Sequence, residues 1–317
     1  MLYLHLFSDT ERASSLFCLM SINGIPLSTI LTRAAGPVEF FLILGGYGLY
    51  AVYKSGTDRH RFSRIAKCFL TYWFTLLCFV PLACWLTDDP DYPGSLKTAF
   101  LSISGFETVW YREAWFLLPY MMVSALYPFL MRVLDSLGSI ATLIVSFVLY
   151  SFTVVLTQRD YIYIGQDVPY IMTFVRMVQF IFPFYLGAFL CKEHVLDKVR
   201  EMDFFRNKRL VLMSLVALIA IRSCFTTYFF IAPAYAFLCI ILLSSVNIRG
   251  CVGALLLHIG RYSLLMWMVH AWIYKYLFPD FIYSFRFPII IFIVLCVVSY
   301  AVSRILHLII PYRILNR

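Results

Sequence analysis

Charged side chains are scarce in this sequence. Asp, Glu, Lys and Arg make up 14% of its 317 residues, whereas hydrophobic residues make up 62% and the mean hydropathy is +0.83. Soluble domains carry about 25% charged and about 45–50% apolar residues. A water-soluble globule of this length could not bury so much apolar surface, because even a compact protein exposes a large share of its residues. The composition therefore excludes a soluble enzyme, a disordered tail and a collagen-like rod, and it indicates a protein dissolved in lipid.

Paired cysteines, repeats and linkers are also missing. The nine cysteines include no Cys-x-x-Cys pair, and several lie inside apolar runs, where free cysteine behaves as a small hydrophobic residue. This excludes a disulfide scaffold. No internal repeat, low-complexity tract or Gly/Ser-rich linker interrupts the chain. We therefore expect residues 1–317 to form a single integral-membrane domain with short loops.

Long apolar runs, by contrast, are abundant. A bilayer core about 30 Å thick needs roughly 20 apolar residues in a helix. Ahead of the first complete run lies a short apolar stretch, Met1–Phe7, which is too short to cross a membrane. The sequence therefore predicts an all-α fold, a polytopic transmembrane helix bundle of about nine full spans plus an N-terminal partial helix. The predicted spans are 34–53, 66–86, 114–131, 138–157, 171–191, 210–229, 231–247, 255–277 and 287–310.

The basic residues predict the orientation of these spans. The protein has 26 Lys and Arg against 17 Asp and Glu, a net charge of +9. With the loop after 34–53 in the cytoplasm, the cytoplasmic segments hold more than twice as many Lys and Arg as the external ones, in line with the positive-inside rule. We therefore expect a cytoplasmic C-terminus. Topology explains the positive charge more simply than a nucleic acid partner does, and we expect no such partner.

Ionisable residues inside the predicted spans are costly to bury, so each is a candidate for a functional site. Glu39, near the start of the first full span, fits either a functional role or an ion pair with Arg33. Arg222 lies near the end of its span, where its side chain can reach the interface. Arg176 shares a helical face with Gln179 and fits a structural and a functional role equally well.

The predicted span 255–277 contains three further polar residues. His258 and Arg261 share a face of the helix, and His270 lies nearly opposite Arg261. No carboxylate or second imidazole stands at the spacing of metal ligands, so we expect no metal site. Each of the three fits either a satisfied polar residue in the bundle interior or a contact to substrate.

Basic residues outside these spans give two more candidates. Arg61 and Arg64 project from one face where a cytoplasmic helix is predicted to begin. Two guanidinium groups at a helix N-terminus suit a phosphorylated ligand, although anchoring at the membrane surface explains the charge as well. His5 is the only side chain of the first apolar stretch able to act as a base near neutral pH. A structural or merely terminal histidine is the alternative.

Five short segments together carry a family signature. They are Leu2–His5, which closes a helix on a histidine, Glu39-Phe-Phe-Leu-Ile-Leu-Gly-Gly-Tyr-Gly48, Arg61-Phe-Ser-Arg64, Trp115-Phe-Leu117, and Gly260-Arg-Tyr-Ser-Leu-Leu-Met-Trp-Met-Val-His270. In their order and in their predicted membrane sides these segments resemble the acyltransferase 3 family, integral-membrane O-acyltransferases that modify bacterial surface glycans. Gly45 stands where that family usually has serine.

The resemblance implies an enzyme, a membrane O-acyltransferase of the bacterial inner (cytoplasmic) membrane. It would move an acyl group, expected to be acetyl, from acyl-CoA to a hydroxyl of a cell-surface or exported polysaccharide, with a glycan or lipid-linked glycan as acceptor. The implied site residues are His5 as general base or acyl relay and Glu39 as a second catalytic candidate, Arg61 and Arg64 for the phosphates of acetyl-CoA, and Trp115, Arg261 and His270 as substrate contacts.

The same resemblance implies a first helix longer than Met1–Phe7, with an arginine upstream of the histidine. A late start codon, a fragment and an inactive copy are the three explanations that the sequence leaves open. A different class of protein, a transporter or flippase for a lipid-linked or anionic glycan precursor, is the alternative function. Arg176, Arg222 and Arg261 could line its path, but the inverted repeats and matching broken helices typical of transporters are not visible in the sequence.

Overall fold

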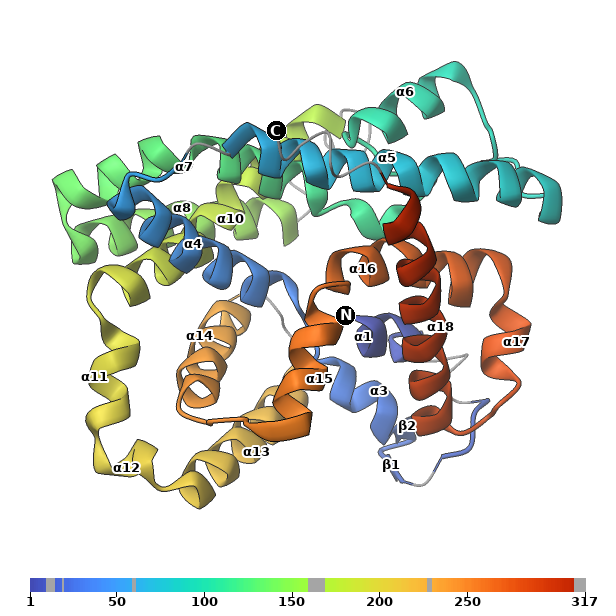
Figure 1. The fold of residues 1–317 in the computed structure, drawn as a ribbon. Coiled ribbons are helices and arrows are strands. Elements are labelled where there is room, and N and C mark those ends of the chain that lie inside the picture. The colour runs from blue at the N-terminus through green and yellow to red at the C-terminus, as the bar shows by residue number, and fades with distance from the viewer. Residues whose placement is uncertain (10–14, 19, 59–60, 159–168, 227–229, 311–317) are drawn as a thin grey trace. The chain divides into compact units, whose positions relative to one another are not determined.

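The computed structural model describes residues 1–9, 15–18, 20–58, 61–158, 169–226 and 230–310. Nearly every regular element in these ranges is a helix (Figure 1), and the two strands found there form one short hairpin. The predicted all-α fold class is confirmed.

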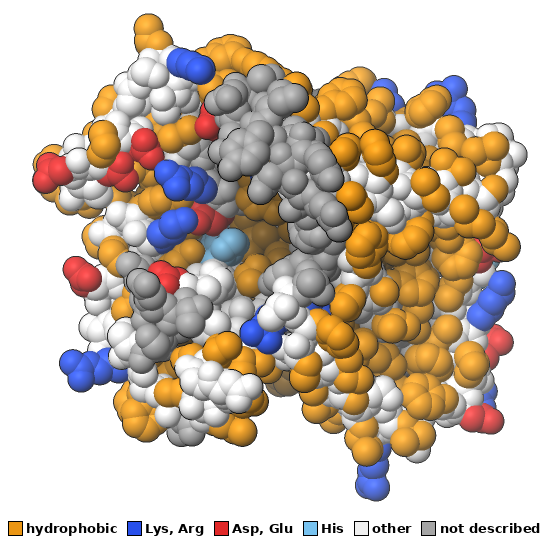
Figure 2. All heavy atoms as spheres, turned by 180° about the vertical axis from the view of Figure 1, so that it is seen from behind, with side chains coloured by type: hydrophobic (Ala, Val, Ile, Leu, Met, Phe, Trp, Pro, Cys, Tyr) orange, Lys and Arg blue, Asp and Glu red, His pale blue; other side chains and the backbone are white. Residues whose placement is uncertain are grey.

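Five helices in the described part of the chain are long and apolar enough to cross a membrane, by length and composition. They correspond to the predicted spans 66–86, 114–131, 138–157, 171–191 and 287–310. A sixth candidate consists of two helices that meet at a bend of 61° within the predicted span 255–277. Large hydrophobic side chains are exposed over much of the face in Figure 2, as contact with lipid requires. The protein is a helical membrane protein, and the number of nine spans stays a prediction.

The chain divides into two compact units, and each is assembled from separate stretches of sequence. Unit 1 comprises Met1–Gly36, Ala66–Ala114 and Ile248–Arg317, and unit 2 comprises Pro37–Ile65 and Trp115–Asn247. A single domain over residues 1–317 stays a prediction.

Unit 1 is built around one deeply buried helix. Every residue of α16 (Ser263–Ala271) from Leu265 onward is buried. The hairpin of this unit turns at Asn23-Gly24, which both have positive φ, as a two-residue hairpin turn requires. The other elements of unit 1 are α1 (Leu2–Phe7), β1 (Ser21–Ile22), β2 (Ile25–Pro26), α3 (Leu27–Thr32), most of α5 (Arg61–Leu86), α6 (Leu96–Ser104), η1 (Arg112–Ala114), α15 (Gly250–Gly260), η2 (Trp272–Leu277), α17 (Pro279–Tyr283) and α18 (Pro288–Ile309).

Unit 2 depends on the close approach of two helices, α4 (Val38–Ser55) and α10 (Pro169–Lys192). A Cβ atom added at Gly187 would lie 1.8 Å from the Ile43 carbonyl oxygen, and one at Gly46 would lie 1.9 Å from that of Phe184. Only glycine allows the two backbones to come so near, a common way of packing helices in membranes. The other elements of unit 2 are the first turn of α5, α7 (Leu117–Leu137), α8 (Ser139–Gln158), α11 (Val195–Glu201), α12 (Asp203–Arg206), α13 (Lys208–Cys224) and α14 (Ile231–Ser244).

Candidate active site

His5 lies on the short helix α1, and hydrogen bonds hold this helix in unit 1. The Tyr3 hydroxyl donates to the Ser28 carbonyl at 3.1 Å, and the Tyr283 hydroxyl donates to the Leu6 carbonyl at 3.0 Å. Leu6 and the residue that follows it are completely buried. The burial of these neighbours fixes the side of the helix on which the half-buried His5 ring lies.

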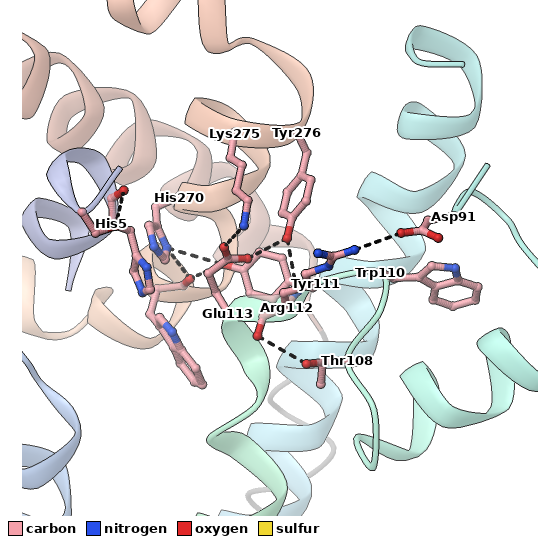
Figure 3. A network of polar contacts seen from close by, with 12 residues as sticks. His5, Asp91, Thr108, Trp110, Tyr111, Arg112, Glu113, His270, Lys275 and Tyr276 are labelled. Carbon is pink, nitrogen blue, oxygen red and sulfur yellow. Dashed lines mark hydrogen bonds and ion pairs between the residues drawn. The ribbon is translucent and has the colours of Figure 1, made fainter. Parts of the chain in front are cut away.

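The structure places His5 beside His270, although the two residues come from opposite ends of the chain. Their ring centroids are 5.3 Å apart and the ring planes are inclined by 39° (Figure 3). His270 is completely buried on α16, and the Tyr274 ring stacks on it at 5.9 Å. Two residues that the sequence singled out separately are thus brought together in one unit.

Hydrogen bonds indicate which nitrogen of His270 carries the proton. Its Nδ1 lies 2.6 Å from the Trp267 carbonyl oxygen, to which the Tyr111 hydroxyl also donates, at 2.5 Å. A carbonyl only accepts, so Nδ1 is the protonated nitrogen and Nε2 carries the free lone pair. Within the described residues this buried Nε2 has no hydrogen-bond partner. It is therefore available to accept a hydrogen bond in the site.

A buried carboxylate, Glu113, lies next to the two histidines. It is 5% exposed, receives hydrogen bonds from Lys275 Nζ at 2.7 Å and from the Tyr276 hydroxyl at 2.9 Å, and interacts electrostatically with His5. Lys275 and Tyr276 lie on η2, a π-helical continuation of α16. Such local π-helices are frequent at functional sites because they change the direction of side chains.

From the sequence, the region Glu107–Trp115 is a candidate contact to the glycan, but Glu113 within it and Lys275 were not singled out as site residues. Both lie outside or at the end of the predicted spans, where a charged residue is expected to be solvated. The one sequence feature that could have identified Glu113 is its position two residues before Trp115, a predicted substrate contact.

Aromatic rings make the other side of this site rigid. Trp272 is completely buried and stacks on Tyr111 at 5.6 Å and on Phe79 at 5.4 Å. Complete burial raises the pKa of the Tyr111 hydroxyl above its usual value, and the nearby Glu113 carboxylate raises it further. The hydroxyl therefore stays protonated and acts as a donor at physiological pH.

Arg61 and Arg64 begin α5 and belong to unit 2. The Arg64 guanidinium pairs with Asp58 at 2.9 Å, and Asp58 in turn accepts a hydrogen bond from the Tyr127 hydroxyl. The Arg61 guanidinium lies 4.6 Å from the centre of the Phe62 ring. The structure keeps both arginines at the helix N-terminus as predicted, and it adds a carboxylate partner, Asp58, to Arg64.

Glu39 and Trp115 also belong to unit 2. Glu39 lies in the first turn of α4 and interacts electrostatically with Arg222. Arg222 is only 2% exposed and donates to the Phe225 carbonyl at 2.9 Å, so in this structure its guanidinium does not reach the protein surface. The Arg176 guanidinium lies 4.9 Å from the centre of the Trp115 ring, a cation–π contact.

Arg261 does not lie on a continuous helix with His270, contrary to the unbroken helix predicted over 255–277. The chain bends by 61° between α15 and α16, where the Ser263 hydroxyl donates to the Gly260 carbonyl at 2.8 Å. Arg261 is exposed at this bend, whereas His270 is buried. Hydropathy alone does not detect such a break, because the residues on both sides of it are apolar.

Metal ligands do not gather in the part of the chain that the structure describes, where no group of three or more His, Cys, Asp or Glu side chains could hold an ion. The absence of a metal site stays a prediction.

Comparison with known proteins identifies the family. The helices define a multi-pass membrane protein, and one of its units holds paired histidines beside a buried carboxylate. A family model described as an acyltransferase domain, that of the acyltransferase 3 family, matches residues 19–308. The chain therefore belongs to the acyltransferase 3 family and is a membrane acyltransferase. The match includes His270, Glu113, Arg61 and Arg64, and it begins after His5. No curated protein and no solved structure gives a significant match.

Proposed function

We propose that the protein is an O-acyltransferase of the bacterial inner membrane that moves an acetyl group from acetyl-CoA to a hydroxyl of a cell-surface or exported polysaccharide. The observation that carries this proposal is the pairing of His5 with His270 beside Glu113, in a chain of this family. An imidazole next to a second imidazole and a carboxylate is suited to remove a proton from a sugar hydroxyl.

In the proposed reaction, one nitrogen of His5 takes the proton of the acceptor hydroxyl as its oxygen attacks the thioester carbonyl. The carbon–sulfur bond breaks, the coenzyme thiolate leaves, and the imidazolium returns its proton to that sulfur. The Nε2 lone pair of His270 can accept a hydrogen bond from the other nitrogen of His5, which leaves the reacting nitrogen unprotonated. Burial lowers the pKa of His5, and the negative charge of Glu113 offsets part of that shift by stabilising the imidazolium that forms.

Arg61 and Arg64 would hold the phosphates of acetyl-CoA in this proposal. Arginine pairs well with phosphate because its planar guanidinium can donate two parallel hydrogen bonds. Arg64 already pairs with a carboxylate, Asp58, so a phosphate that binds here would exchange one anionic partner of the guanidinium for another.

The test is transfer of radioactive acetyl groups from labelled acetyl-CoA to the glycan fraction of cell envelopes that contain the protein. We expect His5→Ala to lower the transfer rate by about 10²–10⁴-fold, the contribution of a positioned general base. The matched control is His194→Asn, at an exposed histidine with positive φ, where asparagine suits the backbone. Transfer that survives both His5→Ala and Arg61→Ala would contradict the site assignment. Movement of a lipid-linked glycan across the membrane without transfer of label would support the flippase instead.

A further inference from the structure

A second polar cluster of unit 1 is not used by the proposed reaction. We call it the α15–α18 cluster, and it consists of His258, Tyr262, Tyr300, Arg304 and His307. His258 Nε2 lies 2.7 Å from the Tyr300 hydroxyl, which also accepts a hydrogen bond from Arg304 at 3.2 Å. The Arg304 guanidinium lies 5.4 Å from the centre of the Tyr262 ring, and the His307 ring packs edge-on against the same ring at 5.3 Å.

Helical spacing produces this cluster from two short stripes. Tyr300, Arg304 and His307 follow one another at i, i+4 and i+7 on α18, so they share one face of that helix. His258 and Tyr262 are four residues apart, on the last turn of α15 and just beyond it. Contacts between the two stripes bring the Arg304 guanidinium and the two histidine rings together around Tyr262.

Within the described residues, no carboxylate neutralises the charge of Arg304. Arg304 is exposed, and its partners within the described residues are the Tyr300 hydroxyl and the Tyr262 ring, with no carboxylate among them. Asp280 is the only acidic residue among residues 248–317. Arg261, exposed at the adjacent bend, adds a further positive charge. An exposed arginine whose described partners are a hydroxyl and an aromatic ring favours an anion as ligand.

The surroundings of the cluster are apolar and exposed. Leu255 and Leu257 on α15 are 57% and 73% exposed, and Ile305 and Leu308 on α18 are 59% and 80% exposed. In a membrane protein such side chains face lipid tails. A ligand with an anionic group at the cluster and hydrocarbon chains beside these residues would satisfy both features.

We propose that the α15–α18 cluster binds the phosphate headgroup of an anionic membrane phospholipid. The Arg304 guanidinium and the His258 and His307 rings supply the donors, and the tyrosine rings fix their orientation. The lipid tails lie along the exposed leucines and isoleucine of α15 and α18. This site is independent of the acyl transfer proposed above, since none of its residues takes part in that reaction.

The experiment uses the full chain purified in a neutral detergent. It is mixed with phosphatidylglycerol or with phosphatidylcholine, lipid retention is measured by native mass spectrometry, and the unfolding temperature is followed by tryptophan fluorescence. We expect phosphatidylglycerol to be retained in preference and to raise the unfolding temperature. Arg304→Gln should weaken the apparent Kd for phosphatidylglycerol roughly tenfold, the loss expected for one charge-assisted hydrogen bond.

Two further variants make the test specific. Arg286→Gln changes an exposed arginine of unit 1 that lies outside the cluster, and it should leave the Kd unchanged. His307→Gln should weaken binding about threefold, and it provides the decisive measurement if Arg304→Gln does not fold.

Several results would overturn the proposal. Equal retention of the two lipids, or an unchanged Kd in both cluster variants, would mean that these cations only anchor the helix ends at the interface. A second arm adds inorganic phosphate or acetyl-CoA to the lipid-bound protein. If either compound displaces phosphatidylglycerol, and if Arg304→Gln also weakens the binding of that compound, the site takes a soluble phosphate and the lipid assignment is wrong.

Discussion

Replacing Glu113 by glutamine tests the buried ion pair of the candidate active site. In the native protein the Glu113 carboxylate accepts hydrogen bonds from Lys275 and Tyr276 while its own side chain is only 4% exposed. Glutamine keeps the size of the side chain and one acceptor oxygen, but it removes the negative charge and replaces the second acceptor by a donor. The hydrogen bond from Lys275 therefore loses its charge assistance, and Lys275 loses its counter-charge, whereas the Tyr276 hydroxyl can accept a hydrogen bond from the new amide.

The magnitude follows from the exposure of the partners. A hydrogen bond to a charged group contributes about 1.5–3 kcal/mol. The Lys275 side chain is 39% exposed, so water compensates part of the lost charge interaction. We therefore expect Glu113→Gln to lower the free energy of unfolding by about 2 kcal/mol. Lys275→Met should lower the free energy of unfolding less in the Glu113→Gln variant than in the native protein, because the two side chains interact directly.

Reversible unfolding in mixed detergent and dodecyl sulfate micelles, followed by tryptophan fluorescence, measures these differences. The control is Asp91→Asn, which removes the other carboxylate pair of this region, with Arg112 at 3.3 Å and side-chain exposures of 69% and 40%. An exposed pair of this kind contributes less than about 1 kcal/mol. Two results would contradict a stabilising Glu113–Lys275 pair. One is a Glu113→Gln variant as stable as the Asp91→Asn control. The other is that Glu113→Gln and Lys275→Met have additive effects on the free energy of unfolding.

Two other predictions concern unit 2. Gly187→Ala should lower the free energy of unfolding by about 3 kcal/mol in the same assay, because its Cβ would overlap the Ile43 carbonyl. The control is Gly48→Ala, which should not lower stability, because no atom lies within 4 Å of the added Cβ. Equal stabilities of these two variants would contradict the close approach of α4 and α10. Asp58→Asn should release Arg64 and lower the KM for acetyl-CoA by up to about fivefold with little change in kcat. A higher KM would show instead that Asp58 positions Arg64 for the coenzyme.

The sequence predicts the spans where hydropathy is the dominant signal. The five helices long enough to cross a membrane lie at predicted positions, because burying an apolar helix in lipid depends on composition and length alone. The bend between α15 and α16 was missed. It depends on local hydrogen bonds such as the one from Ser263 to Gly260, and the hydropathy average does not contain that information.

The site was predicted as separate residues rather than as an arrangement. His5 and His270 were both candidates from sequence, but their contact is set by the packing of α1 against α16 and α18. Glu113 was harder to find, since a carboxylate in a predicted external loop is ordinarily solvated. It is buried because Lys275 and Tyr276 satisfy it, and these partners lie far away in the sequence.

Two arginines that a charge count treats alike differ in the partners that the fold gives them. Arg64 lies in the first turn of α5 and Arg304 lies near the C-terminal end of α18, and both contribute to the net charge of +9. The fold gives Arg64 a carboxylate partner, Asp58, so an incoming phosphate must exchange one anion for another and gains only the difference between them. It gives Arg304 tyrosine partners, which orient the guanidinium without neutralising it. An anion at Arg304 therefore displaces no carboxylate, and an exposed cation of this kind on a lipid-facing helix is most readily met by a lipid phosphate.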